Sequence, residues 1–446
     1  MNQQTTFNPL TLQPAIPKYR WTICALVFFA TTVNYLDRSV ISLMKSELSL
    51  EFHWDDGDYA NTEIAFKLMY AFGMLGAGRL MDKLGTKMGY FLATGLWSLA
   101  AIGHAFASST LGFVLARAAL GATESGNFPA AIKTTAEWFP KRERALATGI
   151  FNSGTNIGAI IAPLSVPFII AQWGWQWAFI ITGSFGFIWL VLWIVVYDVP
   201  SKHKKLSAEE FEYIHSDVED NTAASPTEKV SWFKLLAFRQ TWAFVLGKFL
   251  TDPIWWFYLF WLPDFLTSQY GLKGTELSLP VAMVFVISTF GSIWGGWLPL
   301  HFIRKGWPVF KARKTSMLLY AFLVIPIVFA QIAGQINMWL AVIVIGIATS
   351  AHQAWSANIF TTVSDMFPKK AVGSVTGIGG MFGGLGGIVF TLFVQKDLFV
   401  HYRSIGDIET AYYIMFIICG SAYLLAWTIM HFLVPKNQRI LSLPGL

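Results

Sequence analysis

The chain has 446 residues, of which 54% are hydrophobic and only 13% are charged, and it contains 20 Trp and 38 Phe. So much apolar side chain excludes a soluble globular protein and indicates a polytopic membrane protein that has the lipid bilayer as its solvent. The formal net charge of +6 does not require nucleic acid as a partner, because basic residues also collect beside membrane spans.

Twelve apolar runs of about 20 residues follow one another, and each is long enough to cross a bilayer as a helix. The first run is long enough to span and follows a polar stretch, so we expect it to be retained rather than cleaved as a signal. The runs lie near residues 20–43, 60–81, 88–107, 111–137, 145–171, 177–197, 240–267, 279–303, 315–333, 338–363, 373–395 and 409–433.

One long hydrophilic segment divides these runs into two sets of six. It contains the tract "SAEE", in which Ser207 is a typical helix N-cap. We predict an N-terminal six-helix bundle over residues 1–198, a cytoplasmic linker over 199–238 and a C-terminal six-helix bundle over 239–446.

The two sets also repeat a short pattern. "FPK" at 139–141 and "TGI" at 148–150 recur 228 residues later at 367–369 and 376–378. Repeated halves around a site near the bilayer midplane are an architecture of secondary transporters. We therefore predict an all-α polytopic membrane protein, with twelve transmembrane helices in two pseudo-symmetric bundles.

The basic residues favour one orientation of these spans. Of the 32 Lys and Arg, 23 fall in segments on the side of the N-terminus, whereas only four fall in the opposite loops, namely Lys45, Lys273, Lys396 and Arg403. The positive-inside rule then predicts that both termini are cytoplasmic. The acidic segment 46–59 on the outer side is interpreted as a solvated loop.

The tract "GRLMDKLGTK" between the second and third runs fits the loop motif G-x-x-x-D-R/K-x-G-x-R/K of the major facilitator superfamily. In physical terms, a glycine at its start lets helices approach closely, and a second glycine permits a tight turn. We predict a gating motif here, although the second half has Leu300 where a matching acid would stand. The motif residues are Gly78, Asp82, Lys83, Gly85 and Lys87.

Longer tracts carry a finer resemblance. "NYLDR" (34–38), "EWFPKRERALATG" (137–149) and "GWQWAFIITG" (174–183) resemble the anion:cation symporter family, and "GTKMGY" (85–90) and "AHQAWS" (351–356) resemble its bacterial hexuronate transporters. The resemblance implies proton-coupled import of a sugar-acid anion, galacturonate or glucuronate, through a bacterial inner membrane. The alternative is another organic anion, an aldonate such as galactonate or a dicarboxylate, with sodium as a possible coupling ion. We expect a monomer.

Among the charged residues inside the predicted spans are nine that would each cost about 3 kcal/mol if they faced lipid. They must pair, line a wet cavity or reach the interface. Arg117 and Glu124 are seven residues apart and so share one helical stripe, which we expect to face a cavity. Lys133 lies near a helix end, where it is expected to snorkel or to pair between helices. The remaining members are Asp37, Arg38, Glu63, Lys67, Lys248 and Asp252.

The resemblance implies roles for four of these charges. Arg38 would contact the substrate carboxylate and Asp37 would be a proton-linked site, while Glu124 and Arg117 would complete the relay. A guanidinium suits a carboxylate because its planar fork matches two oxygens. A carboxyl group in a partly desolvated cavity suits proton transfer because burial disfavours its charged form.

Two further pairs lie one helical turn apart, Glu63 with Lys67 and Lys248 with Asp252, and each would hold its helix neutral if the two side chains paired. Alternatively, Lys67 would face the cavity together with Tyr70, a position at which the resembling family contacts substrate. Sugars also stack on aromatic rings and bond to amides, although Trp is common at membrane interfaces and a histidine can simply be packed. The seventh run offers three such rings, Trp255, Trp256 and Tyr258. The candidate substrate-binding residues besides Arg38, Lys67 and Tyr70 are Tyr35, Asn156, Trp255, Tyr258, His352, Gln353 and Asn358.

Nothing in the sequence points to covalent chemistry. It shows neither a metal-ligand cluster nor a nucleophile with a base, so we predict no catalytic residue, no metal and no cofactor beyond the ion gradient. A membrane enzyme or a receptor would need such a constellation or an appended signalling domain. The glycine run 377–387 lacks the ending of a phosphate loop and is predicted to let helices pack. Cys24 and Cys419 are interpreted as small buried hydrophobes.

Overall fold

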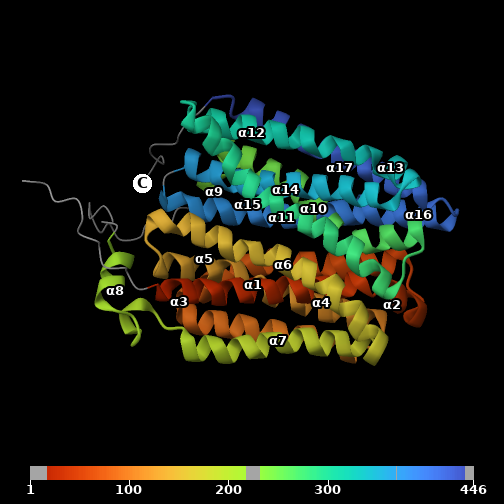
Figure 1. The fold of residues 1–446 in the computed structure, drawn as a ribbon, viewed down its shortest axis with the longest axis horizontal. Helices are drawn as coiled ribbons and strands as arrows, with labels where there is room; N and C mark the ends of the chain where they lie inside the picture. Colours follow the sequence, from red (N-terminus) through yellow and green to blue (C-terminus); the bar gives the residue numbers. More distant parts are fainter. Residues whose placement is uncertain (1–17, 217–231, 368, 437–446) are drawn as a thin grey trace, which may run out of the picture.

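The computed structural model describes residues 18–216, 232–367 and 369–436, and all regular structure in this part of the chain is helical. The long helices run side by side along the longest axis of the molecule (Figure 1). Helices α1 to α7 form one side of the bundle and α10 to α17 the other (Figure 1). We call these two sides the N-terminal and the C-terminal half.

The described helices combine into twelve span-length units, called rods here, each made of one helix, one arm of a helix or several consecutive helices. They match the twelve predicted runs. The first six are α1 (Tyr19–Leu43), the two arms of α3 (Asp56–Gly103), α4 (Thr110–Glu124) with α5 (Asn127–Trp138), α6 (Lys141–Trp173) and α7 (Trp175–Val196). The second six are α10 (Arg239–Tyr270), α11 (Ser278–Arg304), α12 (Val309–Val324) with η4 (Ile325–Phe329) and α13 (Ala330–Ile336), α14 (Met338–Met366), α15 (Lys369–Phe390) with η5 (Thr391–Lys396) and α16 (Asp397–Ser404), and α17 (Ile408–Leu433).

Short helices occupy the two ends of the bundle. They are α2 (Lys45–Phe52), η1 (His104–Phe106), η2 (Pro200–Lys202), α8 (Ala208–Ile214), α9 (Trp232–Leu235) and η3 (Gly274–Leu277). Helix α8 marks one end, called here the linker end, while α2 and α16 lie at the opposite or far end (Figure 1). The predicted N-cap is confirmed, because the Ser207 hydroxyl accepts the backbone N–H of Glu210 at 3.2 Å. Glu210 in turn accepts the backbone N–H groups of Tyr19 and Arg20, so that α8 caps the start of α1.

Helix α3 is 48 residues long because it contains two spans joined at Gly85. This residue has φ 75° and ψ 161°, a backbone region that is essentially open only to glycine. The predicted tight turn at Gly85 is therefore confirmed. It reverses the chain at the linker end, so that the second and third spans run in opposite directions.

We expect Gly85→Ala to lower the free energy of unfolding by roughly 1–3 kcal/mol, which is the strain of a side chain in this region. Apart from Gly85 itself, its two chain neighbours and the adjoining helical backbone, no described atom lies within 4 Å of the position that a Cβ would take, so backbone strain is the expected effect. Gly76→Ala is the matched control, because Gly76 is exposed in the same helix, is equally uncrowded and has no positive φ. Thermal unfolding in detergent would show a lower midpoint for Gly85→Ala only. Equal midpoints for the two variants would contradict the strain.

Seven of the described rods are long and apolar enough to cross a membrane by themselves. Most of those that fall short, including α1, α4 and α10, carry charged residues inside the predicted spans. Because such charges are costly in lipid, these helices must bury one face against their neighbours. The charges thereby collect between the helices, where the candidate site lies.

Three predictions about the glycine run, the cysteines and Lys133 can be compared with this packing. Cβ atoms at Gly379 and Gly386 would lie 2.0 Å from the Phe244 ring and 2.3 Å from the Phe249 carbonyl oxygen, so the glycine run does let α15 pack closely on α10. Cys24 and Cys419 are buried free cysteines, as predicted. Lys133 bonds between helices, since its Nζ donates to the Met81 carbonyl at 2.8 Å.

The interpretation of segment 46–59 as a solvated loop is wrong. Most of its first half forms α2, and Asp56 begins α3 with only 3% of its surface exposed. Trp54 and Tyr59 are buried as well. Acidic residues at the start of a helix are favoured by the helix dipole, and basic side chains from elsewhere in the chain neutralise Asp56, as described below.

Candidate functional site

The first functional cluster joins α1 to α4 through an ion pair. Nε and Nη2 of Arg38 lie 3.0 Å from Oε2 of Glu124, and Nη2 also donates to the Asn34 side chain at 3.3 Å. The side chains of Arg38 and Glu124 are 3% and 0% exposed. Glu124 ends α4 and Asn127 begins α5, so the pair sits at a break in the fourth span. Arg38 therefore holds an internal carboxylate in this structure.

Four aromatic rings surround the Arg38 guanidinium. Its Cζ lies 4.5 Å from the ring centre of Tyr35, 4.9 Å from Tyr70, 5.1 Å from Phe66 and 5.6 Å from Trp256. These distances are within the range of cation–π attraction, which strengthens where water is excluded. Trp256 comes from α10, so the C-terminal half supplies one wall of a cluster that otherwise belongs to the N-terminal half.

Lys67 forms the second ion pair and also reaches the other half. Its Nζ lies 2.8 Å from Oε2 of Glu63, one turn earlier on α3, and donates to the Thr391 hydroxyl of η5 at 2.7 Å. Both Glu63 and Lys67 are buried. The predicted local pair is thus confirmed, and Lys67 also reaches across the interface between the halves, while its predicted contact with substrate stays a prediction. Its ammonium lies 5.5 Å from the ring centre of Trp256.

Arg117 is a buried cation of the cluster, and none of the carboxylates that the structure describes forms an ion pair with it. Its guanidinium lies over Phe66 at 4.3 Å and Phe260 at 5.4 Å, and the side chain is 1% exposed. Within the described part of the chain, its Nε and Nη2 find no hydrogen-bond acceptor. A buried charge without a partner is costly, so this guanidinium is well placed to bind an anion.

Asp37 is the corresponding carboxyl group without a cation. It is 2% exposed, the Thr182 hydroxyl lies beside it, and among the described residues no Lys or Arg forms an ion pair with it. It interacts electrostatically with Glu124, the carboxylate that Arg38 holds. Asp37 and Arg38 are adjacent on α1 but point to different surroundings, as their separation of about 100° on a helix predicts.

The C-terminal half contributes a separate group around His352. Its Nδ1 is hydrogen-bonded to the Tyr423 hydroxyl at 2.5 Å, and its ring stacks on Trp255 with 5.0 Å between centres. The predicted Lys248–Asp252 pair is confirmed at 2.7 Å. This group is held by partners of its own half and does not contact Arg38.

The candidate amides are divided between the halves. The Gln353 side chain donates to Asn156 at 2.8 Å, a hydrogen bond that joins α14 to α6 across the interface. Asn358 instead donates to the carbonyl oxygens of Gly295 and Ala354, so its amide supports the backbone. Tyr258 is buried within the C-terminal half, with its hydroxyl beside Cys419.

Sequence reasoning did not single out the residues that organise this cluster. The seventh span offered several aromatic residues, and it is Trp256, with Phe260 one turn later, that faces Arg38, Lys67 and Arg117. Phe66, one turn before Tyr70, lies against both arginines. The helical spacing of these rings was the available signal, because i and i+4 residues share a face.

The gating motif is only partly described. Gly85 forms the turn, Lys83 is exposed, and Lys87 pairs with Asp198 at 3.0 Å. The surroundings of Gly78 and the side chain of Asp82 lie outside the described residues. The gating role of this motif therefore stays a prediction.

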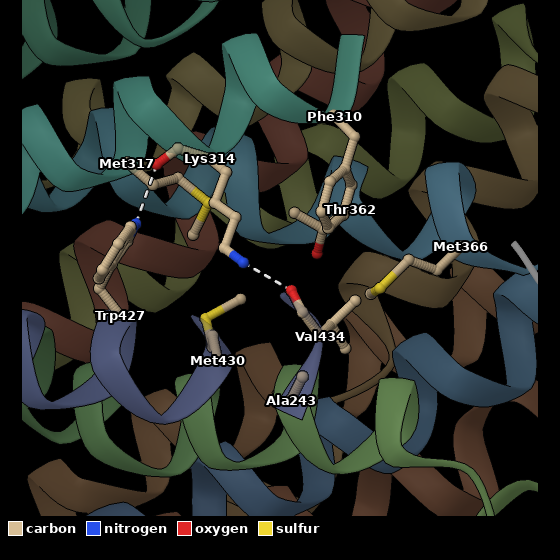
Figure 2. Close-up of a pocket in the computed structure, with 9 residues that line it drawn as sticks. All are labelled: Ala243, Phe310, Lys314, Met317, Thr362, Met366, Trp427, Met430 and Val434. Atoms are coloured by element: carbon tan, nitrogen blue, oxygen red, sulfur yellow. Dashed lines mark hydrogen bonds between the residues drawn. The ribbon is translucent and has the colours of Figure 1, made fainter. Parts of the chain in front are cut away.

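A different cavity lies within the C-terminal half, lined mainly by α10, α12, α14 and α17 (Figure 2). The Lys314 ammonium in it donates to the Val434 carbonyl at 2.5 Å, and the Trp427 indole donates to the Lys314 carbonyl at 2.9 Å. Because its one ammonium is already bonded and most other lining groups are apolar, this cavity does not suit a sugar acid. Its lining residues are Ala243, Phe310, Lys314, Met317, Thr362, Met366, Trp427, Met430 and Val434.

Curated relatives of the chain include several transporters. It is 35% identical over 376 residues to the "Hexuronate transporter" of Escherichia coli (strain K12), a match that covers 84% of this chain and 87% of that one. It is 36% identical over 308 residues to the "Galacturonate transporter" of Dickeya chrysanthemi, covering 69% and 89%. It is 27% identical over 384 residues to the "D-galactonate transporter" of Escherichia coli O6:H1, covering 84% and 88%.

The fold is shared with solved transporter structures. A D-xylose-proton symporter aligns with a TM-score of 0.73 at 16% identity, over 95% of this chain and 100% of that one. A bacterial homologue of the human lysosomal transporter Spinster, in an inward-facing conformation, aligns with a TM-score of 0.70 at 17% identity, again over 95% and 100%. The predicted all-α, twelve-helix fold class is confirmed.

The profile of the Major Facilitator Superfamily matches residues 27–391. Together with the relatives, this match confirms the prediction of a membrane transporter rather than an enzyme. The chain belongs to the major facilitator superfamily.

Proposed function

We propose that the protein imports a hexuronate, galacturonate or glucuronate, together with protons, by alternating access. Two relatives at 35% and 36% identity that are named as hexuronate and galacturonate transporters support this substrate class. The observation that carries the proposal is the buried guanidinium of Arg117, two of whose nitrogens find no acceptor in the described part of the chain, beside two neutralised ion pairs. We further propose that the linker end is cytoplasmic in a bacterial inner membrane, with both termini on that side, because the basic residues collect there.

The charges of the N-terminal half explain why a proton would accompany the anion. Arg38, Lys67 and Arg117 balance Asp37, Glu63 and Glu124 when all six are ionised, and two of the three possible pairs are formed. One substrate carboxylate would leave this desolvated cluster with a net negative charge, which is costly. Protonation of Asp37 or Glu124 restores neutrality, so one proton would enter with each monoanion.

Arg117 and Arg38 would then play different parts. Arg117 is available to the carboxylate at once, whereas Arg38 becomes available only when Glu124 is protonated and releases it. Tyr35, Tyr70 and Trp256 would line the sugar, and Gln353 with Asn156 would meet its hydroxyl groups from the interface. Substrate and internal carboxylates compete for the same guanidinium groups, which links binding to protonation.

This scheme predicts electroneutral transport of galacturonate. A membrane potential changes the driving force by about 2.3 kcal/mol per 100 mV for each net charge moved, which corresponds to about 50-fold in accumulation. We therefore expect a potential of about 100 mV to leave pH-driven galacturonate accumulation in proteoliposomes nearly unchanged. Galactarate, a dianion, would serve as the contrasting substrate if it is carried. If the membrane potential changed galacturonate accumulation by tens of fold, the pairing of one proton with one carboxylate would be contradicted.

The main experiment compares ion gradients. Purified protein in liposomes should accumulate labelled galacturonate when the outside is acidic and should not respond to an inward sodium gradient at equal pH. The relative named as a D-galactonate transporter, at 27% identity, makes galactonate the second candidate substrate. Unlabelled galacturonate and glucuronate should therefore compete more strongly than galactonate. Stronger competition by galactonate would overturn the hexuronate assignment, and accumulation driven by sodium alone would overturn proton coupling.

A further inference from the structure

Four charged residues close the far end of the molecule in a single network. Lys45 begins α2, Asp56 begins α3, Asp264 lies near the end of α10, and Arg403 lies in α16. The Lys45 ammonium lies 2.7 Å from Asp56 and 2.9 Å from Asp264. Arg403 bonds to Asp264 at 2.8 Å through Nη2 and to Asp56 through Nε. Each cation thus bonds to both carboxylates.

Two of these four contacts cross from one half to the other. Lys45 of the N-terminal half reaches Asp264 of the C-terminal half, and Arg403 of the C-terminal half reaches Asp56 of the N-terminal half. The two other contacts stay within a half. If the halves separated here, Lys45 would keep Asp56, and Arg403 would keep Asp264. Neither half would be left with an uncompensated buried charge, so the network can break and re-form without the cost of exposing an unpaired charge in the interior.

An aromatic layer lies directly beneath this network. The Lys45 ammonium lies 4.4 Å from the ring centre of Trp261, whose ring also meets Tyr59 edge-on at 5.4 Å. The Tyr59 hydroxyl donates to the Phe260 carbonyl at 2.9 Å, again across the halves. Phe260 itself lies against Arg117 and Lys67 of the candidate site. The network and the layer therefore separate that site from the far end.

The burial of the charges fits a closed entrance. The side chains of Asp56, Lys45 and Asp264 are 3%, 6% and 9% exposed, whereas Arg403 is 40% exposed and meets the exterior. By the positive-inside rule, basic residues are scarce on the outer side of a membrane protein. Lys45 and Arg403 are two of the four basic residues that the predicted topology places on that side. Their ion pairs with buried carboxylates explain why Lys45 and Arg403 occur on that side.

We propose that Lys45, Asp56, Asp264 and Arg403 form a far-end latch that closes the outer entrance and must open before substrate can enter. This latch rests on the proposed function only in that the far end is taken to be extracellular. Its strength sets the balance between the conformation described here, closed at the far end, and one open at that end. Weakening the cross-half contacts shifts this balance toward the open conformation.

The test measures the distance across the far end without any substrate. Spin labels are placed at Leu50→Cys in α2 and Ile405→Cys after α16, positions that are 80% and 60% exposed, while the two natural cysteines are buried. Arg403→Gln removes one cross-half contact, and Lys273→Gln removes an equivalent charge from an exposed site of the same half. Pulsed electron paramagnetic resonance in detergent is expected to show at least twice as much of the long-distance population for Arg403→Gln as for Lys273→Gln.

A second variant from the other half keeps the test decisive. Asp56→Asn weakens the same contact from the N-terminal half and should shift the distances in the same direction, whereas Arg403→Lys should shift them less than Arg403→Gln. Distance distributions of Arg403→Gln and Asp56→Asn that match Lys273→Gln would overturn the latch. A shift in both variants would support the latch even if the protein proved to carry a different anion, because no substrate is present.

Discussion

Glu124→Gln is expected to exchange labelled for unlabelled galacturonate across a vesicle membrane but to lose its accumulation against a gradient. Glutamine keeps an oxygen that can accept from Arg38, which now lies 3.0 Å from the carboxylate, but it cannot take up or release a proton. A pH difference of one unit supports up to about tenfold accumulation with one proton per substrate. The variant should stop near a ratio of one, while its counterflow rate stays measurable.

Glu137→Gln is the matched control for this experiment. Glu137 is a partly buried glutamate of the same half that accepts hydrogen bonds from Thr86 and Tyr197, each at 2.6 Å, away from the charged cluster. A glutamine there should leave accumulation at the wild-type level. Normal pH-driven accumulation by Glu124→Gln would show that the coupling proton is carried elsewhere, and Asp37 would be examined next.

Arg117→Lys is expected to weaken galacturonate binding by 10-fold to 100-fold, about 1.5–3 kcal/mol for a charge-assisted hydrogen bond. The lysine keeps the positive charge but loses the planar fork that holds a carboxylate through two nitrogens. Nε and Nη2 of Arg117 have no acceptor among the described residues, so the effect should fall on substrate binding. Titration calorimetry of the purified variant with galacturonate measures it.

Arg38→Lys provides the comparison for Arg117→Lys. Because Arg38 is already engaged by Glu124 and Asn34, a lysine there can still neutralise Glu124, and we expect a smaller loss of affinity. Neutral galactose should bind weakly to all three proteins and show whether the acid group is what they recognise. A larger loss of galacturonate affinity for Arg38→Lys than for Arg117→Lys would show that Arg38 binds the substrate carboxylate, as the sequence resemblance implies.

Features that depend on one stretch of the chain, such as spans, turns and ion pairs within a helix, could be predicted from the sequence. Apolar length gave the twelve spans, and a spacing of one turn gave the pairs of Lys67 with Glu63 and of Lys248 with Asp252. The glycine of the loop motif gave the turn at Gly85. Each of these depends on local geometry, which is set by neighbours in the chain.

Side-chain contacts between different helices could not be predicted in the same way. Helical spacing places Arg117 and Glu124 on one stripe, but it does not reveal that Arg38 of another helix takes the carboxylate. The seventh span offered adjacent rings, and only the packing of the two halves shows that Trp256 faces the cluster while Trp255 stacks on His352. The acidic composition of segment 46–59 favours a solvated Asp56, because the sequence does not show that Lys45 and Arg403, which lie in other segments, are its partners.

The most direct test of coupling is proton uptake when substrate binds. Galacturonate is titrated into purified protein in weakly buffered solution near neutral pH, with neutral galactose as the control. The charge balance of the cluster predicts the uptake of about one proton for each galacturonate bound by the wild type, and a clear reduction in Glu124→Gln. Binding of galacturonate with no change in pH would contradict the claim that a proton replaces the charge which the substrate carboxylate brings.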